Sequence, residues 1–137
     1  MRTGRRTAMG AILGAVLAMP FVGSHAVAAG AAELGMLRQL EPGLWSVRYR
    51  EGAGASKICV RTGTELLALN PPAANCRRSI VEDGTSQVVV QDSCRGNGYA
   101  RTSVRRESAK LVQISAQGFG RGVPFTISAE ARRTGSC

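Results

Sequence analysis

The sequence predicts a mainly β protein: an antiparallel meander forming a small sandwich or a curled, barrel-like sheet, with one short helix and two disulfides. Three observations support this fold class. Apolar and polar residues alternate along several stretches, glycine-containing turns separate these stretches, and four cysteines lie far apart in the chain. Alternation with a period of two is typical of strands that bury one face, and closely spaced turns are typical of antiparallel sheets.

Residues 1–28 have the pattern of a secretory signal peptide. They begin with three arginines and no acidic residue, residues 8–22 are largely apolar, and residues 26–28 read Ala-Val-Ala. A cationic start, a short apolar run and small residues at the cleavage site are the three parts of such a signal. The apolar run is shorter than the roughly 20 residues that a bilayer span needs. We therefore expect a periplasmic or secreted protein without a transmembrane span after cleavage.

Loss of the signal changes the composition of the mature chain. Cleavage after residue 28 of 137 leaves 109 residues, enough for one domain with a modest core. It removes three of the 18 basic residues and none of the 9 acidic ones, so the net charge becomes about +6. The only histidine, His25, leaves with the signal. Without histidine, Ser-His-Asp machinery and histidine-ligated metal sites cannot form. Enzymes can work with carboxylates, tyrosine or lysine alone, so catalysis is disfavoured and not excluded, and we expect no enzyme, metal or cofactor.

After the signal we expect a flexible lead-in over 29–40, whose alternative is a turn or two of helix over 33–38, and a single disulfide-stabilised β domain over 41–137. The domain opens with a Pro42-Gly43 turn and a strand in which Trp45, Val47 and Tyr49 alternate with polar residues. The alternation predicts that these three side chains face inward, and that the arginines between and after them face solvent.

The remaining elements follow from the same pattern. A brief strand is expected over 57–60, and a short helix over 62–69 that ends at Asn70-Pro71-Pro72. Five further strands are expected over 76–82, 85–94, 98–106, 110–118 and 123–134. Glycine-rich or polar turns separate them, the clearest being Asp83-Gly84.

The four cysteines are Cys59, Cys76, Cys94 and Cys137. No C-x-x-C pair occurs, which disfavours a metal or redox site, and an even number in a small exported domain predicts two structural disulfides. A two-residue turn at Asp83-Gly84 would place Cys76 opposite Gln91, so that Cys94 would point to the other face of the sheet. We therefore expect the pairs Cys59–Cys76 and Cys94–Cys137.

Several of these features occur together in a known family. They are Pro42-Gly43-Leu44-Trp45, a cysteine before a short helix at Cys59, a cysteine after a polar loop at Cys76, another ending a strand at Cys94, and a basic tail ending in Cys137. This arrangement resembles the bacterial domain-of-unknown-function family 3617. The resemblance implies a periplasmic or envelope location and a mostly antiparallel fold, and it brings no catalytic residues. Ser46 departs from the family, whose members often have an acidic residue after the tryptophan.

Two groups of residues are candidates for binding. The first is a surface for an anionic partner, such as lipopolysaccharide, lipid headgroups or an acidic protein, made by Arg48, Arg50, Arg101, Arg105 and Arg132. Its alternative is a set of arginines scattered over a solvated surface. The second is an apolar pocket at Trp45 and Tyr49, whose alternative is packing in the core. Nucleic acid is not expected, because aromatic residues are scarce and the protein is exported.

The sequence thus predicts a non-enzymatic periplasmic or envelope domain with a binding or structural role, whose partner is an anionic envelope component or another periplasmic protein. The alternatives are a carrier of a small apolar ligand and an inhibitor of a secreted hydrolase. Three carboxylates, Glu82, Asp83 and Asp92, come nearest to an acid/base pair, but turn formation explains Glu82 and Asp83 better.

Overall fold

The computed structural model describes residues 34–52, 54–69, 76–96 and 98–137. The predicted signal peptide, the start of the lead-in and the predicted helix stop at Asn70-Pro71-Pro72 lie outside these ranges. Within them the chain forms one seven-stranded antiparallel sheet and two short 3₁₀ helices.

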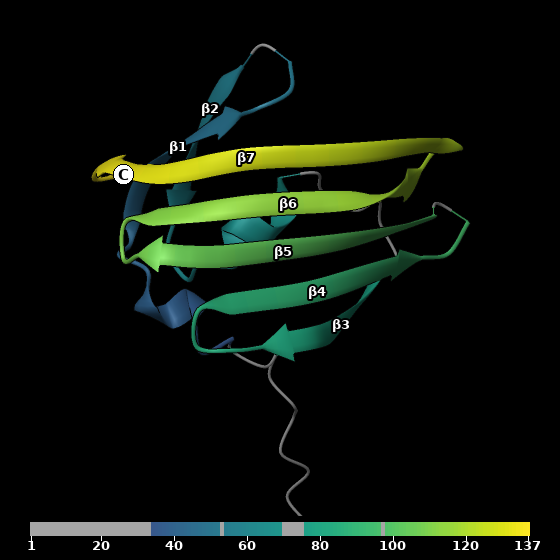
Figure 1. Cartoon of the computed structure of the whole chain (residues 1–137), viewed down its shortest axis with the longest axis horizontal. Helices are drawn as coiled ribbons and strands as arrows, with labels where there is room; N and C mark the ends of the chain where they lie inside the picture. Colours follow the sequence, from purple (N-terminus) through teal and green to yellow (C-terminus); the bar gives the residue numbers. More distant parts are fainter. Residues whose placement is uncertain (1–33, 53, 70–75, 97) are drawn as a thin grey trace, which may run out of the picture.

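The strands run in the spatial order β2-β1-β7-β6-β5-β4-β3 (Figure 1). Their bounds are β1 Gly43–Tyr49, β2 Ala55–Val60, β3 Cys76–Asp83, β4 Gln87–Cys94, β5 Gly98–Ser108, β6 Leu111–Gly120 and β7 Val123–Gly135. Strands β3 to β7 form the expected meander, and β1 pairs with the last strand, β7. The predicted fold class is confirmed, and the sheet takes the curled form.

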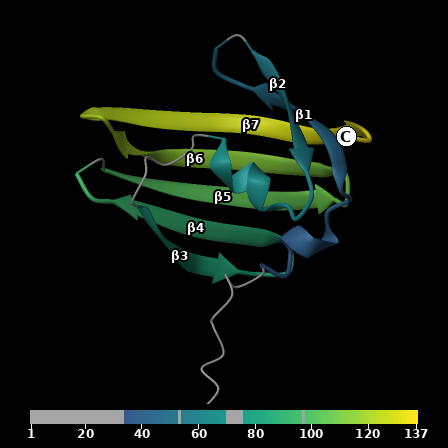
Figure 2. The same cartoon turned by 180° about the vertical axis from the view of Figure 1, so that it is seen from behind.

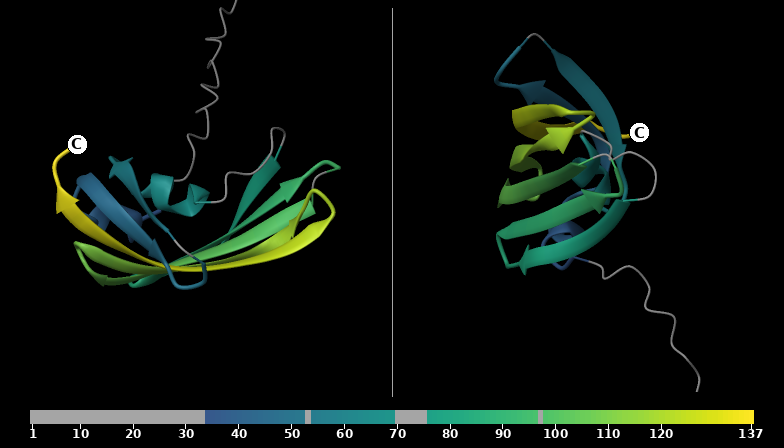
Figure 3. Two further views of the ribbon diagram at one scale, coloured as in Figure 1. Left: turned by 90° about the horizontal axis from the view of Figure 1, so that it is seen from above. Right: turned by 90° about the vertical axis from the view of Figure 1, so that its right-hand side faces the viewer.

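The sheet bends into a trough with one concave and one convex face (Figure 3). The concave face carries the core, which includes Trp45 and Val47 of β1, Val104 of β5 and Ile114 of β6. These side chains alternate along each strand with more exposed ones, so burying one face explains the period-two pattern.

Two 3₁₀ helices and their flanks cover the concave face (Figures 2 and 3). η2, Thr64–Ala68, lies where a short helix was predicted and buries Leu66 and Leu67. The Glu65 carboxylate accepts hydrogen bonds from the backbone N–H groups of Arg61 and Thr62. Burial raises the pKa of Glu65, but these and neighbouring backbone hydrogen bonds outweigh it and bring the pKa below its usual value.

The other 3₁₀ helix, η1 (Leu37–Gln39), belongs to a segment that the sequence suggested was flexible. Instead, residues 34–40 contribute four buried side chains to the core: Leu34, Met36, Leu37 and Leu40. A side chain added at Gly63 would collide with Leu37, which shows how closely η1 packs against the segment leading into η2. The β domain therefore begins before residue 41, because the open trough needs apolar cover that its own strands do not supply.

The disulfides join Cys59 to Cys137 and Cys76 to Cys94. The predicted pairs, Cys59–Cys76 and Cys94–Cys137, are therefore wrong. The first bridge fastens the end of β2 to the residue that follows β7 by two positions, and the second joins the start of β3 to the end of β4.

The error lies in the register of the β3–β4 hairpin. The turn is wider than the two residues predicted, because the last paired residues are Asp83 and Val88. An irregularity between Ile80 and Glu82 then leaves one extra residue on β3. Together they move Cys76 by three positions, so that it faces Cys94 directly.

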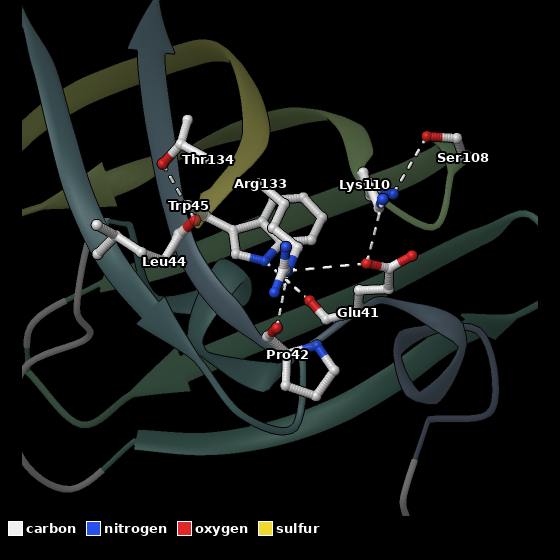
Figure 4. Close-up of polar contacts among 8 residues, drawn as sticks. All are labelled: Glu41, Pro42, Leu44, Trp45, Ser108, Lys110, Arg133 and Thr134. Atoms are coloured by element: carbon white, nitrogen blue, oxygen red, sulfur yellow. Dashed lines mark hydrogen bonds and ion pairs between the residues drawn. The ribbon is translucent and has the colours of Figure 1, made fainter. Parts of the chain in front are cut away.

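The Pro-Gly-Leu-Trp segment is held by a network at one end of the sheet (Figure 4). The Trp45 indole is fully buried and donates a hydrogen bond from Nε1 to the Glu41 carbonyl, 3.0 Å away. Arg133 donates to the Pro42 carbonyl at 2.8 Å, and the Glu41 carboxylate lies 3.8 Å from Arg133 and 3.5 Å from Lys110. This network fixes the first strand against the end of β7 and the β5–β6 turn.

Gly43 is required at this point. Its φ is +147°, and a side chain there would collide with the Gly135 carbonyl and the Arg133 guanidinium. Glycine alone adopts this conformation readily and leaves room for the approaching backbone. The motif that carries the family resemblance thus has a structural explanation.

Candidate functional site: the convex face

The convex face is lined by the side chains that alternate with the core. Each of four arginines follows or precedes a buried residue in its strand: Arg48 follows Val47, Arg132 follows Ala131, Arg105 follows Val104 and Arg101 precedes Thr102. Arg50 follows the same alternation beyond β1. All five arginines of the predicted anionic-partner surface therefore lie on one face, which we call the convex arginine face.

Register sets the spacing on this face. Arg48 is in line with Glu130, Gln113 and Arg105 on the successive strands β7, β6 and β5. At about 4.8 Å per strand, the Cα atoms of Arg48 and Arg105 lie about 14 Å apart, and Arg101 lies a similar distance from Arg105 along β5. One extended polyanion can span such distances.

The five arginines differ in how far they are neutralised. Arg105 forms an ion pair with Glu107 at 2.9 Å, and Arg132 lies 3.8 Å from Glu130. Arg50 donates to the uncharged Gln113 side chain at 2.7 Å. Arg48 and Arg101 have no ion-pair partner among the described residues. Since exposed pairs are weak and easily exchanged, the face remains positively charged overall.

Two depressions lie on this face beside the arginines. One, of about 300 Å³, lies between β1 and β7 and is lined by Ser46, Arg48, Glu130, Arg132 and Thr134. The other, of about 260 Å³, crosses β5, β6 and β7 beside Arg101 and is lined mainly by hydroxyl and amide side chains. Hydroxyl, amide and guanidinium groups suit hydrogen bonding to phosphate or sulfate oxygens.

The two residues predicted to line an apolar pocket, Trp45 and Tyr49, pack in or against the core. Trp45 is fully buried within the core, and Tyr49 packs against that core as a partly buried side chain. The structure thus places Trp45 and Tyr49 with core packing, the alternative to a binding pocket.

The carboxylates considered for acid/base chemistry are also separated. Asp92 is buried and bonded through both oxygens to Arg78, at 2.8 and 2.9 Å. The hydrogen bond from Arg78 to Asp92, with the attraction of its charge, raises the pKa of that guanidinium against the opposing effect of burial. Glu82 and Asp83 end β3, on the exposed edge strand. Asp92 thus has a structural partner and no neighbouring carboxylate in its strand.

Within the described ranges, no group of three or more histidine, cysteine or acidic side chains is placed to hold a metal ion. No helix among the same residues is long and apolar enough to cross a bilayer.

A second set of surface residues was not singled out from the sequence. The ends of β3 to β7 opposite the Trp45 network carry three exposed apolar side chains, Tyr99, Phe119 and Val123. Three more arginines, Arg77, Arg95 and Arg121, accompany them, together with Arg101 of the convex arginine face. In the sequence, residues 95–99 and 119–123 each combine glycines typical of a turn with an aromatic residue, which could have pointed to this set. Only the register shows that the two turns are neighbours.

The chain matches no protein-family model, no curated protein and no solved structure. The resemblance to domain-of-unknown-function family 3617 therefore stays a prediction that depends on the motifs quoted above.

Proposed function

We propose that this protein is a non-enzymatic, exported domain that binds a phosphate-bearing component of the cell envelope through its convex arginine face. The observation that carries the proposal is the common orientation of five arginines on one side of the sheet: Arg48, Arg50, Arg101, Arg105 and Arg132. Guanidinium groups bind phosphate through paired, charge-assisted hydrogen bonds, and a sheet holds them at fixed spacing.

The location in this proposal depends on two features. Residues 1–28 have the composition of a signal peptide, and all four cysteines are in disulfides, which persist in oxidising compartments such as the periplasm. Mass spectrometry of the protein from a periplasmic extract is expected to find a chain starting at residue 29. Recovery of the uncleaved chain from the cytoplasm would contradict export.

The carrier and inhibitor alternatives have less support. A carrier needs an open apolar cavity near Trp45 and Tyr49, and Trp45 is completely buried. No described feature identifies an inhibitory loop. Binding through the arginines is therefore the function that we test.

The test uses two probes, purified lipopolysaccharide and soluble inorganic polyphosphate, titrated against the protein with its disulfides formed. The triple variant Arg48→Gln, Arg101→Gln, Arg132→Gln is expected to bind either probe about 100-fold more weakly, at about 1 kcal/mol for each arginine. The matched control removes the same charge elsewhere with Arg38→Gln, Arg61→Gln and Lys110→Gln, and a loss of less than about tenfold is expected. Equal losses in the two triple variants, or no binding by the unchanged protein, would refute the proposal.

A further inference from the structure

We propose that the end of the sheet around Tyr99 docks onto an anionic lipid surface, with Phe119 and Val123 entering the headgroup layer. This inference rests on the proposed function, and it names the phosphate-bearing partner as a membrane leaflet. We call this region, made of residues 76–79, 91–96, 98–102 and 116–127, the Tyr99 end.

The apolar part of the Tyr99 end is formed by neighbouring strands. Tyr99 pairs with Phe119, which pairs with Pro124, so the three side chains lie in one row across β5, β6 and β7 on the convex face. Tyr99 is 50% exposed and Phe119 43%. Val123, which precedes Pro124 and pairs with Gly120, is 62% exposed at the start of β7 and by alternation points to the other face of the same sheet end. The β4–β5 and β6–β7 turns beside them point in the same direction (Figure 1). Exposed apolar residues grouped in this way usually mark an interaction site.

The charge of the Tyr99 end is almost entirely positive. Asp92 is its only acidic residue and is already bonded to Arg78. The other arginines are Arg77, Arg95, Arg101 and Arg121, none of which has an ion-pair partner within the part of the chain described. These four arginines therefore contribute a charge of +4 next to the exposed aromatic rings, and no carboxylate of the Tyr99 end is left to neutralise it.

This combination favours a lipid surface over a soluble polyanion. Burial of aromatic and branched apolar side chains at the boundary between headgroups and acyl chains is favourable. Arginines beside them can bond the lipid phosphates at the same time. A soluble polyanion would use the arginines but would leave Val123 and Phe119 in water. Two turns at the end of a sheet can also enter a headgroup layer without any matching pocket.

The experiment measures binding to vesicles of phosphatidylglycerol and phosphatidylcholine in equal parts, to vesicles of phosphatidylcholine alone, and to soluble polyphosphate. We expect binding to the anionic vesicles and little to the neutral ones. The double variant Phe119→Ser, Val123→Ser should bind the anionic vesicles at least about tenfold more weakly, with unchanged binding to polyphosphate.

A matched control removes two similarly exposed apolar side chains elsewhere. Ile80 and Val81 on the edge strand β3 are 45% and 46% exposed, and Ile80→Ser, Val81→Ser should keep full vesicle binding. The fluorescence of the buried Trp45 shows whether each variant is folded. In a further variant, Phe119→Trp, spin-labelled lipid should quench the new indole.

Three outcomes would overturn the inference. Binding to polyphosphate without binding to anionic vesicles would refute lipid docking but leave the proposed function standing. Vesicle binding that survives Phe119→Ser, Val123→Ser, or that falls equally in the Ile80→Ser, Val81→Ser control, would refute the Tyr99 end as the docking region. Absence of binding to all three probes and to lipopolysaccharide would refute the proposed function as well.

Discussion

The two ends of the curled sheet differ in how they use charged and aromatic residues. At the Trp45 end, the indole is buried, and Glu41, Lys110 and Arg133 are arranged in ion pairs around the first strand (Figure 4). At the Tyr99 end, the aromatic rings are exposed and the arginines, apart from Arg78, lack ion-pair partners in the described chain. The same residue types therefore hold the first strand in place at one end, and at the other they lie exposed, with the arginines other than Arg78 unpaired in the described chain.

The difference has a simple physical cause. An arginine already bonded to a carboxylate has fewer free N–H donors and less uncompensated charge for a second anion, whereas an unpaired arginine offers all of its donors and its full charge. Exposed apolar side chains likewise add nothing to the core, but their transfer from water into a second apolar phase is favourable. Substitutions at the Trp45 end should therefore affect stability, and substitutions of the exposed residues at the Tyr99 end should affect binding.

Each end has its own disulfide, and removing them should give the largest effects on stability. The bridge Cys59–Cys137 closes a loop of 78 residues, and Cys76–Cys94 closes one of 18. From loop closure alone, changing both cysteines of the first bridge to serine should lower the free energy of unfolding by about 4.5 kcal/mol, and of the second by about 3 kcal/mol. Urea denaturation followed by Trp45 fluorescence checks the order, and equal or reversed losses would contradict it.

The next largest effect should come from the one neutralised arginine at the Tyr99 end. Arg78→Ala leaves the Asp92 carboxylate buried without its bidentate partner, so unfolding should become easier by about 3 kcal/mol. The neighbouring Arg77→Ala is the control, because Arg77 is exposed and has no ion pair among the described residues. It should change stability by less than about 0.5 kcal/mol. Similar losses in both variants would show that the two arginines do not differ in role.

At the Trp45 end, Gly43→Ala should cost about 2 kcal/mol, because alanine strains the backbone at φ +147° and collides with Gly135 and Arg133. Gly54→Ala is the matched control, since a side chain there meets nothing within 4 Å. Thermal unfolding of the two variants checks the prediction. A Gly43→Ala protein as stable as the control would mean that the first strand can move away from β7.

Most of the fold follows from local patterns in the sequence. Strands β4 to β7 begin and end within a few residues of the predicted ranges, because each buries one face and glycine-containing or polar turns separate them. The disulfide pairs could not be predicted, because they depend on an extra residue near Val81 and on a wider turn after Asp83. A one-residue change in register moves every later side chain to the other face, and no local pattern revealed it.

The candidate site could also be predicted only in part, because alternation is a local pattern and register is not. Alternation is enough to indicate that Arg48, Arg101 and Arg132 avoid the core, and a single sheet then places them on one face. Alternation alone does not predict the Tyr99 end, because Tyr99 and Phe119 are 20 positions apart in the sequence and become neighbours only through the β5–β6 register. The burial of Leu34 and Leu37 similarly depends on the curvature of the sheet.

The smallest predicted effect tests the comparison between the two ends directly. Glu41→Gln removes the carboxylate that lies near both Lys110 and Arg133, and should lower the free energy of unfolding by about 0.5–1 kcal/mol at low salt. Because these side chains are partly exposed, added salt should shrink the loss.

Arg101→Gln changes the net charge by the same amount, in the opposite direction, at the Tyr99 end. With no ion-pair partner in the described chain to lose, it should leave stability within about 0.3 kcal/mol of the unchanged protein while weakening vesicle binding. Urea denaturation at two salt concentrations and vesicle co-sedimentation measure the two properties side by side. If Arg101→Gln destabilised the fold as much as Glu41→Gln, the arginines of the Tyr99 end would be structural, and the division of roles between the ends would fail.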